Sequence, residues 1–175
     1  MKKIKDALKK LQSIIGIKRR DFIASFSIIA AAVVIDQLTK LLAVKFLKPI
    51  PTHPILENVL HLTYHENRGA AFGMLADQRW IFLSVSTVMI IGLLIYLLMG
   101  KCENMLYTVS VAMIIGGGIG NMIDRVALGY VVDFLDFRLI NFAIFNGADS
   151  FVCVGSGLLI LALLLDIIRE AKAKK

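Results

Sequence analysis

The sequence predicts an α-helical membrane protein with four transmembrane helices. First, 58% of its 175 residues are hydrophobic, which is more apolar surface than a domain of this size can bury. Second, four long runs carry few charges and match the roughly 20 residues that cross a bilayer, over residues 22–47, 80–99, 105–122 and 148–168. Third, many basic residues lie at the two chain ends. We expect one membrane-embedded domain over residues 1–175.

The basic residues indicate how these helices are oriented. The net charge is +7, with eight Lys or Arg residues within residues 2–20 and four within residues 169–175. Basic flanks of membrane helices face the cytoplasm and contact anionic lipid, so this charge does not indicate a nucleic-acid partner. Four spans then place both termini in the cytoplasm. The connections over residues 48–79 and 126–147 are expected outside it.

Residues 1–20 form a basic N-terminal extension. Ile4, Leu8, Leu11 and Ile15 recur at helical spacing with lysines on the opposite face, which predicts an amphipathic helix on the membrane surface. A cleaved signal peptide is the alternative, with the alanines at 30–32 as the cleavage site. Because the apolar run continues past those alanines, we expect the extension to be retained.

The first span contains an ionisable pair, Asp36 and Lys40, four residues apart and therefore on one helical face. At ~1.5 Å per residue from Phe22, Asp36 lies roughly 21 Å along the helix, in the half away from the basic terminus. Two interpretations stay open. The pair either neutralises itself and fixes helix packing, or orients polar groups at the same depth on other helices.

Residues 48–79 form a small β-rich lobe outside the cytoplasm rather than a span. Prolines mark its start, and β-branched and aromatic residues predict extended segments around an Asn-Arg-Gly turn. Asn67 and Gly69 are expected to form a tight turn that presents an amide to a peptide backbone. His61 and His65 lack a helix and a convincing third ligand, so we expect no metal and no other cofactor.

The stretch over residues 116–150 gathers carboxylate and amide side chains between two apolar runs. Ionisable groups next to hydrocarbon are costly, so their presence indicates a functional site. Asp133 lies in an apolar, strand-like segment, where helix capping does not account for a carboxylate. Two carboxylates held close in an apolar site share a proton, which provides an acid and a base for attack on an amide. We choose Asp133 with Asp149 as this dyad and keep Asp124 with Asp149 as the second choice.

Other polar residues of this stretch have simpler interpretations. Asp124 precedes Arg125, which indicates a structural role at the helix end, either charge-paired or hydrogen-bonded. Asp136 is expected to be a solvated charge at the rim. Asn121 and Asn146 each precede an aspartate by three residues, a spacing that also suits helix capping.

Five motifs of the chain resemble the lipoprotein signal peptidases, also called signal peptidase II. They are DQLTK (36–40), NRGAAFG (67–73), GNMIDR (120–125), VVDF (131–134) and FNGADS (145–150), in the family's order and rough spacing. The resemblance covers about residues 30–160 and implies a bacterial aspartic endopeptidase of the cytoplasmic membrane. It implies removal of the signal peptide from prolipoproteins, just before a cysteine that carries diacylglycerol. The basic extension is longer than the family leads us to expect, and the connection between VVDF and FNGADS is shorter.

Motif by motif, the resemblance implies a role for each candidate residue. Asp133 and Asp149 match the catalytic dyad, which we expect at the outer leaflet of the membrane. Positions that hold the substrate backbone or shape the pocket are matched by Asn67, Asn121, Arg125 and Asn146, and Asp36 with Lys40 match a supporting pair. Prolipoprotein substrates and membrane lipid are the expected partners, and we expect a monomer.

Two alternatives come from other functional classes. A small tetraspan transporter would use Asp36, Asp124 and Asp149 as a proton or cation relay. It would explain buried carboxylates, but not their concentration at one face beside a lobe. A non-catalytic lipid-binding or assembly protein is the third interpretation, and it would need no paired aspartates.

Overall fold

The computed structural model describes residues 16–69 and 78–174. Its helices are α2 (Arg19–Phe46), α3 (Arg79–Leu98), α4 (Met105–Ala127) and α5 (Gly147–Ala173), and each is long and apolar enough to cross a membrane. The four predicted spans are therefore present. The predicted amphipathic helix falls almost wholly outside the described residues.

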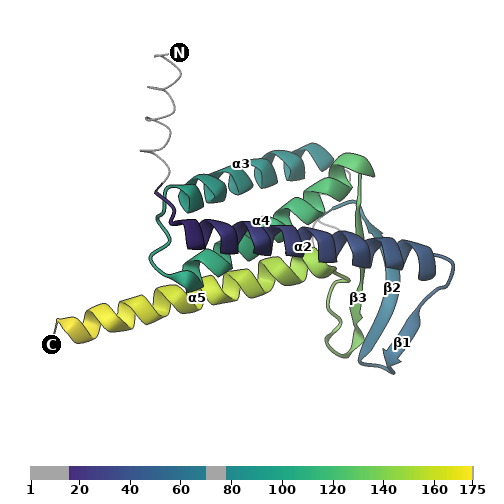
Figure 1. The fold of residues 1–175 in the computed structure, drawn as a ribbon. Coiled ribbons are helices and arrows are strands. Elements are labelled where there is room, and N and C mark those ends of the chain that lie inside the picture. Colours follow the sequence, from purple (N-terminus) through teal and green to yellow (C-terminus); the bar gives the residue numbers. More distant parts are fainter. Residues whose placement is uncertain (1–15, 70–77, 175) are drawn as a thin grey trace, which may run out of the picture.

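The helices alternate in direction along the bundle. Both ends of the described chain lie at one end of the bundle, and a small sheet lies at the other (Figure 1). α4 is the central and most buried helix, packing against α2, α3 and α5. Glycines permit this close approach, because a Cβ on Gly116 would meet Ala32 of α2 at 2.7 Å and a Cβ on Gly155 would meet the Ser110 carbonyl at 2.9 Å.

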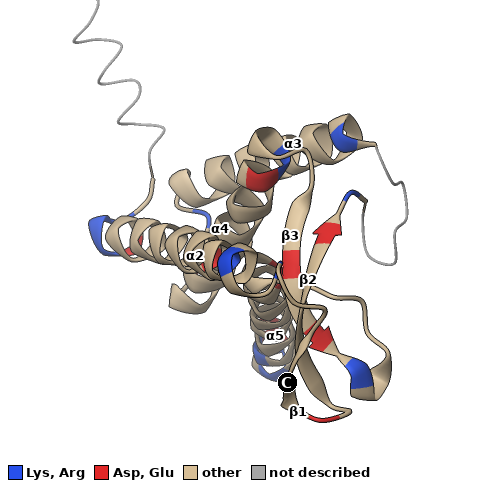
Figure 2. Cartoon of the chain, turned by 90° about the vertical axis from the view of Figure 1, so that its right-hand side faces the viewer, with Lys and Arg blue, Asp and Glu red and all other residues tan. Residues whose placement is uncertain are grey.

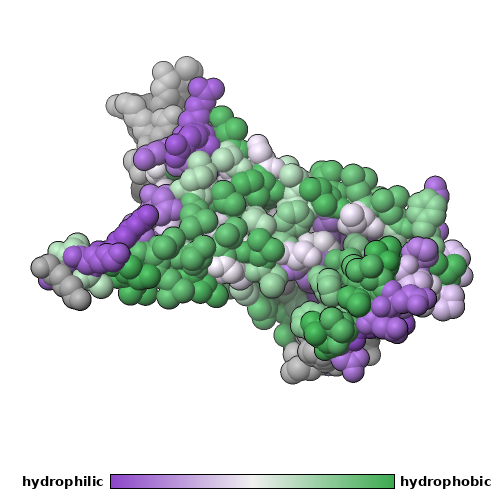
Figure 3. Space-filling model, turned by 90° about the horizontal axis from the view of Figure 1, so that it is seen from below, coloured by the Kyte–Doolittle hydropathy of each residue, from purple (hydrophilic) through white to green (hydrophobic). Residues whose placement is uncertain are grey.

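The outer surface of the helices is apolar. Val34, Leu41, Val88 and Ile167 each leave more than half of their surface exposed. Figure 3 shows hydrophobic side chains over the helical part of one face and hydrophilic ones gathered towards its two ends. Such a surface is stable against acyl chains but not against water, which supports insertion in a bilayer.

The sheet contains β1 (His53–Leu56), β2 (Leu60–Asn67) and β3 (Val131–Phe137), all antiparallel and in that order. A 3₁₀ turn, η2 (Arg138–Ile140), follows β3. β3 is the strand nearest the helices (Figure 2), and its Val132 and Phe134 pack against Ala43 and Leu47 at the end of α2. The predicted lobe over residues 48–79 therefore supplies two strands, and the third comes from the connection between α4 and α5.

Two helix ends differ from the prediction. α4 continues to Ala127 instead of ending near residue 122, because polar residues of its last turns find partners on other elements and do not terminate the helix. α5 continues to Ala173 instead of ending near residue 168, and its added turns are charged and exposed.

Candidate active site

Asp133 lies in the middle of β3, with only 1% of its surface exposed. Nδ2 of Asn67 donates to its Oδ2 at 2.9 Å, and Nδ2 of Asn146 donates to its Oδ1 at 2.6 Å. Burial and the neighbouring charge of Asp149 raise the pKa of Asp133 to about 7, although the two amide hydrogen bonds lower it. Asp133 therefore retains a proton in a substantial fraction of molecules at neutral pH.

Asp149 lies in the first turn of α5, where the helix N-terminus favours a negative charge. Nδ2 of Asn121 donates to its Oδ1 at 2.7 Å, and the backbone N–H of Asn146 donates to its Oδ2 at 3.2 Å. Oδ1 of Asn146 accepts from the Asp149 N–H at 3.0 Å, which completes a capping box. Asn146 thus caps α5 and also binds Asp133, so one buried side chain joins the two aspartates.

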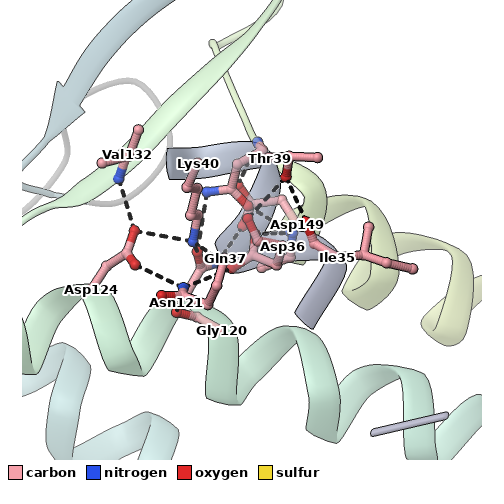
Figure 4. A network of polar contacts seen from close by, with 12 residues as sticks. Ile35, Asp36, Gln37, Thr39, Lys40, Gly120, Asn121, Asp124, Val132 and Asp149 are labelled. Atoms are coloured by element: carbon pink, nitrogen blue, oxygen red, sulfur yellow. Dashed lines mark hydrogen bonds and ion pairs between the residues drawn. The ribbon is translucent and has the colours of Figure 1, made fainter. Parts of the chain in front are cut away.

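An ion network lies beside the aspartates, formed by residues of α2 and α4 (Figure 4). Nζ of Lys40 lies 2.9 Å from Oδ2 of Asp36 and 3.1 Å from Oδ2 of Asp124, and it donates to Oδ1 of Asn121 at 2.9 Å. All three charged residues are at most 4% exposed. The predicted pairing of Asp36 with Lys40 is confirmed, and through Asn121 the pair also reaches another helix at the same depth.

The two carboxylates of this network connect further elements of the fold. Oδ1 of Asp36 accepts from the Ala148 N–H at 2.8 Å and so anchors the start of α5. Oδ2 of Asp124 accepts from the Val132 N–H at 3.0 Å and so anchors β3 next to Asp133. Buried carboxylates need such donors, since an unpaired ion away from water is strongly unfavourable. The network holds the strand and the helix start that carry the dyad candidates.

A cavity of about 430 Å³ opens between α3, α4 and α5. Its polar part contains Asn67, Asn121, Arg125 and Asp149, and the remaining wall is mainly apolar, formed by residues such as Phe82, Met89, Ile90, Leu93, Ile114 and Val152. The Arg125 guanidinium lies over the ring of Phe82 at 4.9 Å, and its Nη2 donates to the Gly69 carbonyl at 3.3 Å. A mostly apolar cavity with a few convergent polar groups suits a largely hydrophobic ligand that carries an amide.

The predicted turn at Asn67 and Gly69 is present, and the Asn67 amide has a partner that the local sequence does not indicate. The Gly69 N–H donates to Oδ1 of Asn67 at 3.0 Å, as in an Asx turn. One N–H of the Asn67 NH₂ group donates to Asp133, and Asn67 also lines the cavity. Partners across the sheet leave no signal in the local sequence pattern.

Asp124 is charge-paired and hydrogen-bonded, as its predicted structural role requires, whereas the prediction of a solvated Asp136 is wrong. Asp124 is paired with Lys40, 84 positions away in the chain, and no ion pair joins it to the adjacent Arg125 within the described residues. Asp136 accepts from Oγ1 of Thr63 at 2.8 Å and pairs with Arg138 at 3.0 Å, so it is a bonded side chain and not a solvated one.

One residue of the network, Gln37, is absent from the sequence-based prediction. Its Nε2 donates to Oδ1 of Asp124 at 3.0 Å and also contacts Asp36 and the Gly120 carbonyl. Its position inside DQLTK is the one signal that points to it. Over residues 16–69 and 78–174, no group of three His, Cys, Asp or Glu side chains is arranged as metal ligands, and Nδ1 of His61 lies 3.3 Å from Oγ1 of Thr52.

Four spanning helices and a cluster of buried carboxylates and amides beside an apolar cavity define an integral membrane protein with a candidate site for acid–base chemistry. A model of the signal peptidase (SPase) II family matches residues 28–165, and the chain belongs to that family. Family membership makes it a peptidase and a bacterial membrane protein.

Individual relatives agree with this assignment. The chain is 54% identical over 129 residues to the lipoprotein signal peptidase of Caldanaerobacter subterraneus subsp. tengcongensis, covering 74% of this chain and 88% of that protein. It is 42% identical over 141 residues to the lipoprotein signal peptidase of Brevibacillus brevis, covering 81% and 95%. A solved bacterial membrane enzyme superposes with a TM-score of 0.77 at 34% identity, over 82% of this chain and 89% of that one.

Proposed function

We propose that this chain is an aspartic endopeptidase that removes the signal peptide from diacylglyceryl-modified prolipoproteins, with Asp133 and Asp149 as its catalytic dyad. The observation that carries the proposal is Asn146, whose side chain binds Asp133 while its backbone N–H binds Asp149. Two carboxyl groups joined through one residue, one of them with a pKa of about 7, provide an acid and a base together.

The proposed roles follow from the different surroundings of the two aspartates. Asp149, at a helix N-terminus and accepting two N–H donors, is the ionised base. It takes a proton from water, whose oxygen attacks the scissile carbonyl carbon, while protonated Asp133 gives its proton to the carbonyl oxygen. Asp149 then gives the proton it took from water to the amide nitrogen, and the carbon–nitrogen bond breaks. A hydroxyl group of the tetrahedral intermediate returns its proton to Asp133, so the two carboxyl groups again hold one proton between them. No cofactor enters this sequence.

Asp124 is the weaker candidate for the dyad. Its Oδ1 accepts from Gln37, and its Oδ2 accepts from Lys40 and from the Val132 N–H. These contacts engage both carboxylate oxygens, so Asp124 is not free to bind and activate water. The same contacts disfavour a proton relay through Asp36 and Asp124.

The cavity supports the choice of substrate. It joins the polar site to an apolar wall contributed by three spanning helices. A diacylglyceryl group bound along that wall would contribute binding free energy and would hold the scissile bond of the attached peptide at Asp149. Cleavage just before the lipidated cysteine is the register that the family resemblance implies.

Charge distribution supports the proposed orientation in the cytoplasmic membrane. The start of α2 and the end of α5 lie at the end of the bundle opposite the sheet (Figure 1). Lys18 and Arg19 belong to the start of α2, and Lys172 and Lys174 to the end of α5. Because basic flanks remain cytoplasmic, we assign both termini to the cytoplasm and the sheet and dyad to the outer leaflet.

The experiment is cleavage of a diacylglyceryl-modified prolipoprotein peptide by the purified enzyme in detergent. We expect Asp133→Asn and Asp149→Asn each to lower the rate at least about 1,000-fold, since each removes one member of the acid–base pair. Asp136→Asn, on the same strand but bonded to Thr63 and Arg138, is the matched control and should keep its activity. An active Asp133→Asn enzyme would remove Asp133 from the dyad, and a wild-type enzyme without cleavage would favour the transporter or lipid-binding alternatives.

A further inference from the structure

Three asparagine amides donate to the two aspartates, and each amide is oriented by a group that can only donate. The Gly69 N–H binds Oδ1 of Asn67, and the Asp149 N–H binds Oδ1 of Asn146, each at 3.0 Å. The Lys40 ammonium binds Oδ1 of Asn121 at 2.9 Å. Since an amide has its oxygen and its NH₂ group on opposite sides, a donor at the oxygen turns the NH₂ group towards the carboxylate.

Asn121 differs from the other two asparagines in what holds it. The groups that orient Asn67 and Asn146 are backbone N–H groups, which remain after any side-chain substitution. Asn121 depends on side chains, the charged Lys40 and a neutral donor, Nδ2 of Asn146 at 3.1 Å. A hydrogen bond from an ammonium is about twice as strong as one from a neutral donor, so Lys40 contributes the larger part.

We propose that Lys40 is a positioning residue for the cleavage reaction: it fixes the amide of Asn121 so that Nδ2 donates to Oδ1 of Asp149 and holds that carboxylate ready to accept a proton from water. This inference rests on the proposed function, and it gives the buried lysine a task besides neutralising its acidic neighbours. The Nδ2-to-Oδ1 distance of 2.7 Å is the shortest donor contact that Asp149 receives from the described residues.

The hydrogen-bond geometry of the ammonium supports this task. An ammonium has three N–H donors, and those of Lys40 point to Oδ2 of Asp36, Oδ2 of Asp124 and Oδ1 of Asn121. Both carboxylates have additional donors, the Ala148 N–H for Asp36 and the Val132 N–H for Asp124. The third N–H of the ammonium points to Asn121, the side chain that donates to Asp149.

The test is a double-mutant cycle with cleavage of the lipidated peptide as the readout. We expect Lys40→Met to lower kcat about 10- to 100-fold in the wild-type enzyme, with KM changed less than about 3-fold, because the loss affects the reacting carboxylate rather than substrate binding. In an Asn121→Ala background, the same Lys40→Met change should lower kcat less than about 3-fold, since the amide that Lys40 orients is gone. Equal kcat losses in both backgrounds would overturn the inference and leave the proposed function intact.

A second variant decides the matter if Lys40→Met does not fold. Asn121→Asp keeps the side-chain volume and an oxygen for Lys40 to bind, but it replaces the donor to Asp149 by a second carboxylate oxygen. The Lys40 ammonium offsets part of the repulsion between the two carboxylates, so we expect a folded protein with kcat lowered about 100-fold. An Asn121→Asp enzyme with more than about a third of the wild-type kcat would contradict the inference. Absence of cleavage by the wild-type enzyme would instead refute the proposed function itself.

Discussion

Replacing Gly120 by alanine tests whether the contact between α2 and α4 supports the site. A Cβ at this position would lie 2.5 Å from Oδ2 and 3.0 Å from Cγ of Asp36, and 3.3 Å from Cβ of Ala148. Asp36 cannot move away easily, because Lys40 and the Ala148 N–H hold its two oxygens. Overpacking of this kind costs about 1–3 kcal/mol, and the better helix propensity of alanine returns about 0.5–1 kcal/mol. Because Asp36 is fixed by its partners, the upper half of the overpacking range applies, and the net loss in unfolding free energy is about 1–2.5 kcal/mol.

Thermal unfolding in detergent measures this loss, and peptide cleavage measures its effect on the site. We expect Gly120→Ala to lower Tm by about 2–8 °C and to slow cleavage at least about 10-fold, since Asp36 anchors the start of α5. Gly157→Ala is the matched control, because no atom lies within 4 Å of its added Cβ, and it should leave Tm and activity unchanged or slightly raised. Equal Tm values for wild type and Gly120→Ala would refute the reasoning.

Three further predictions concern the cavity, the orientation and the pH dependence. Gly118→Leu should fill the cavity and raise KM about 10-fold or more with kcat nearly unchanged. The control is Gly118→Ala, whose added Cβ meets only Ile90 and which should bind substrate nearly normally. A Gly118→Leu enzyme with lowered kcat and unchanged KM would contradict the prediction. In a variant without Cys102 and Cys153, Glu57→Cys should react in intact cells with a membrane-impermeant maleimide, and lack of labelling would reverse the orientation. Between about pH 4 and 7, Asp133 keeps its proton in the native protein but loses it in the unfolded chain. The unfolding free energy of wild type should therefore fall by up to about 4 kcal/mol as pH rises over this range, whereas that of Asp133→Asn should not show this fall. Parallel pH curves for the two proteins would exclude the raised pKa.

Long apolar runs and terminal charges are sufficient to predict the architecture, because a spanning helix must carry its own apolar surface within one continuous segment. Helix boundaries are harder to predict. The polar residues near 121–125 indicate the end of a helix by local pattern, whereas α4 continues to Ala127 because Lys40 and Gln37 of α2 bind Asp124. Partners on another helix leave no local pattern.

The same limit applies to the sheet and to the site. β3 is recognisable as an apolar, strand-like segment, but its pairing with β2 joins residues more than 60 positions apart. The acidic residues of the candidate site can be selected from chemistry, since a carboxylate such as Asp133 is costly in an apolar segment unless it has a function. Their hydrogen-bond donors cannot be assigned in this way, so the bond from Asn67 to Asp133 is missing from the prediction.

A proton held on Asp133 beside ionised Asp149 is the central claim of the mechanism, and infrared titration of the purified protein tests it most directly. Between pH 5 and 9, we expect wild type to lose the carbonyl band of a protonated carboxyl group with a midpoint near pH 7. The band should be absent from Asp133→Asn and retained in Asp136→Asn. A band that titrates identically in wild type and Asp133→Asn would contradict the account.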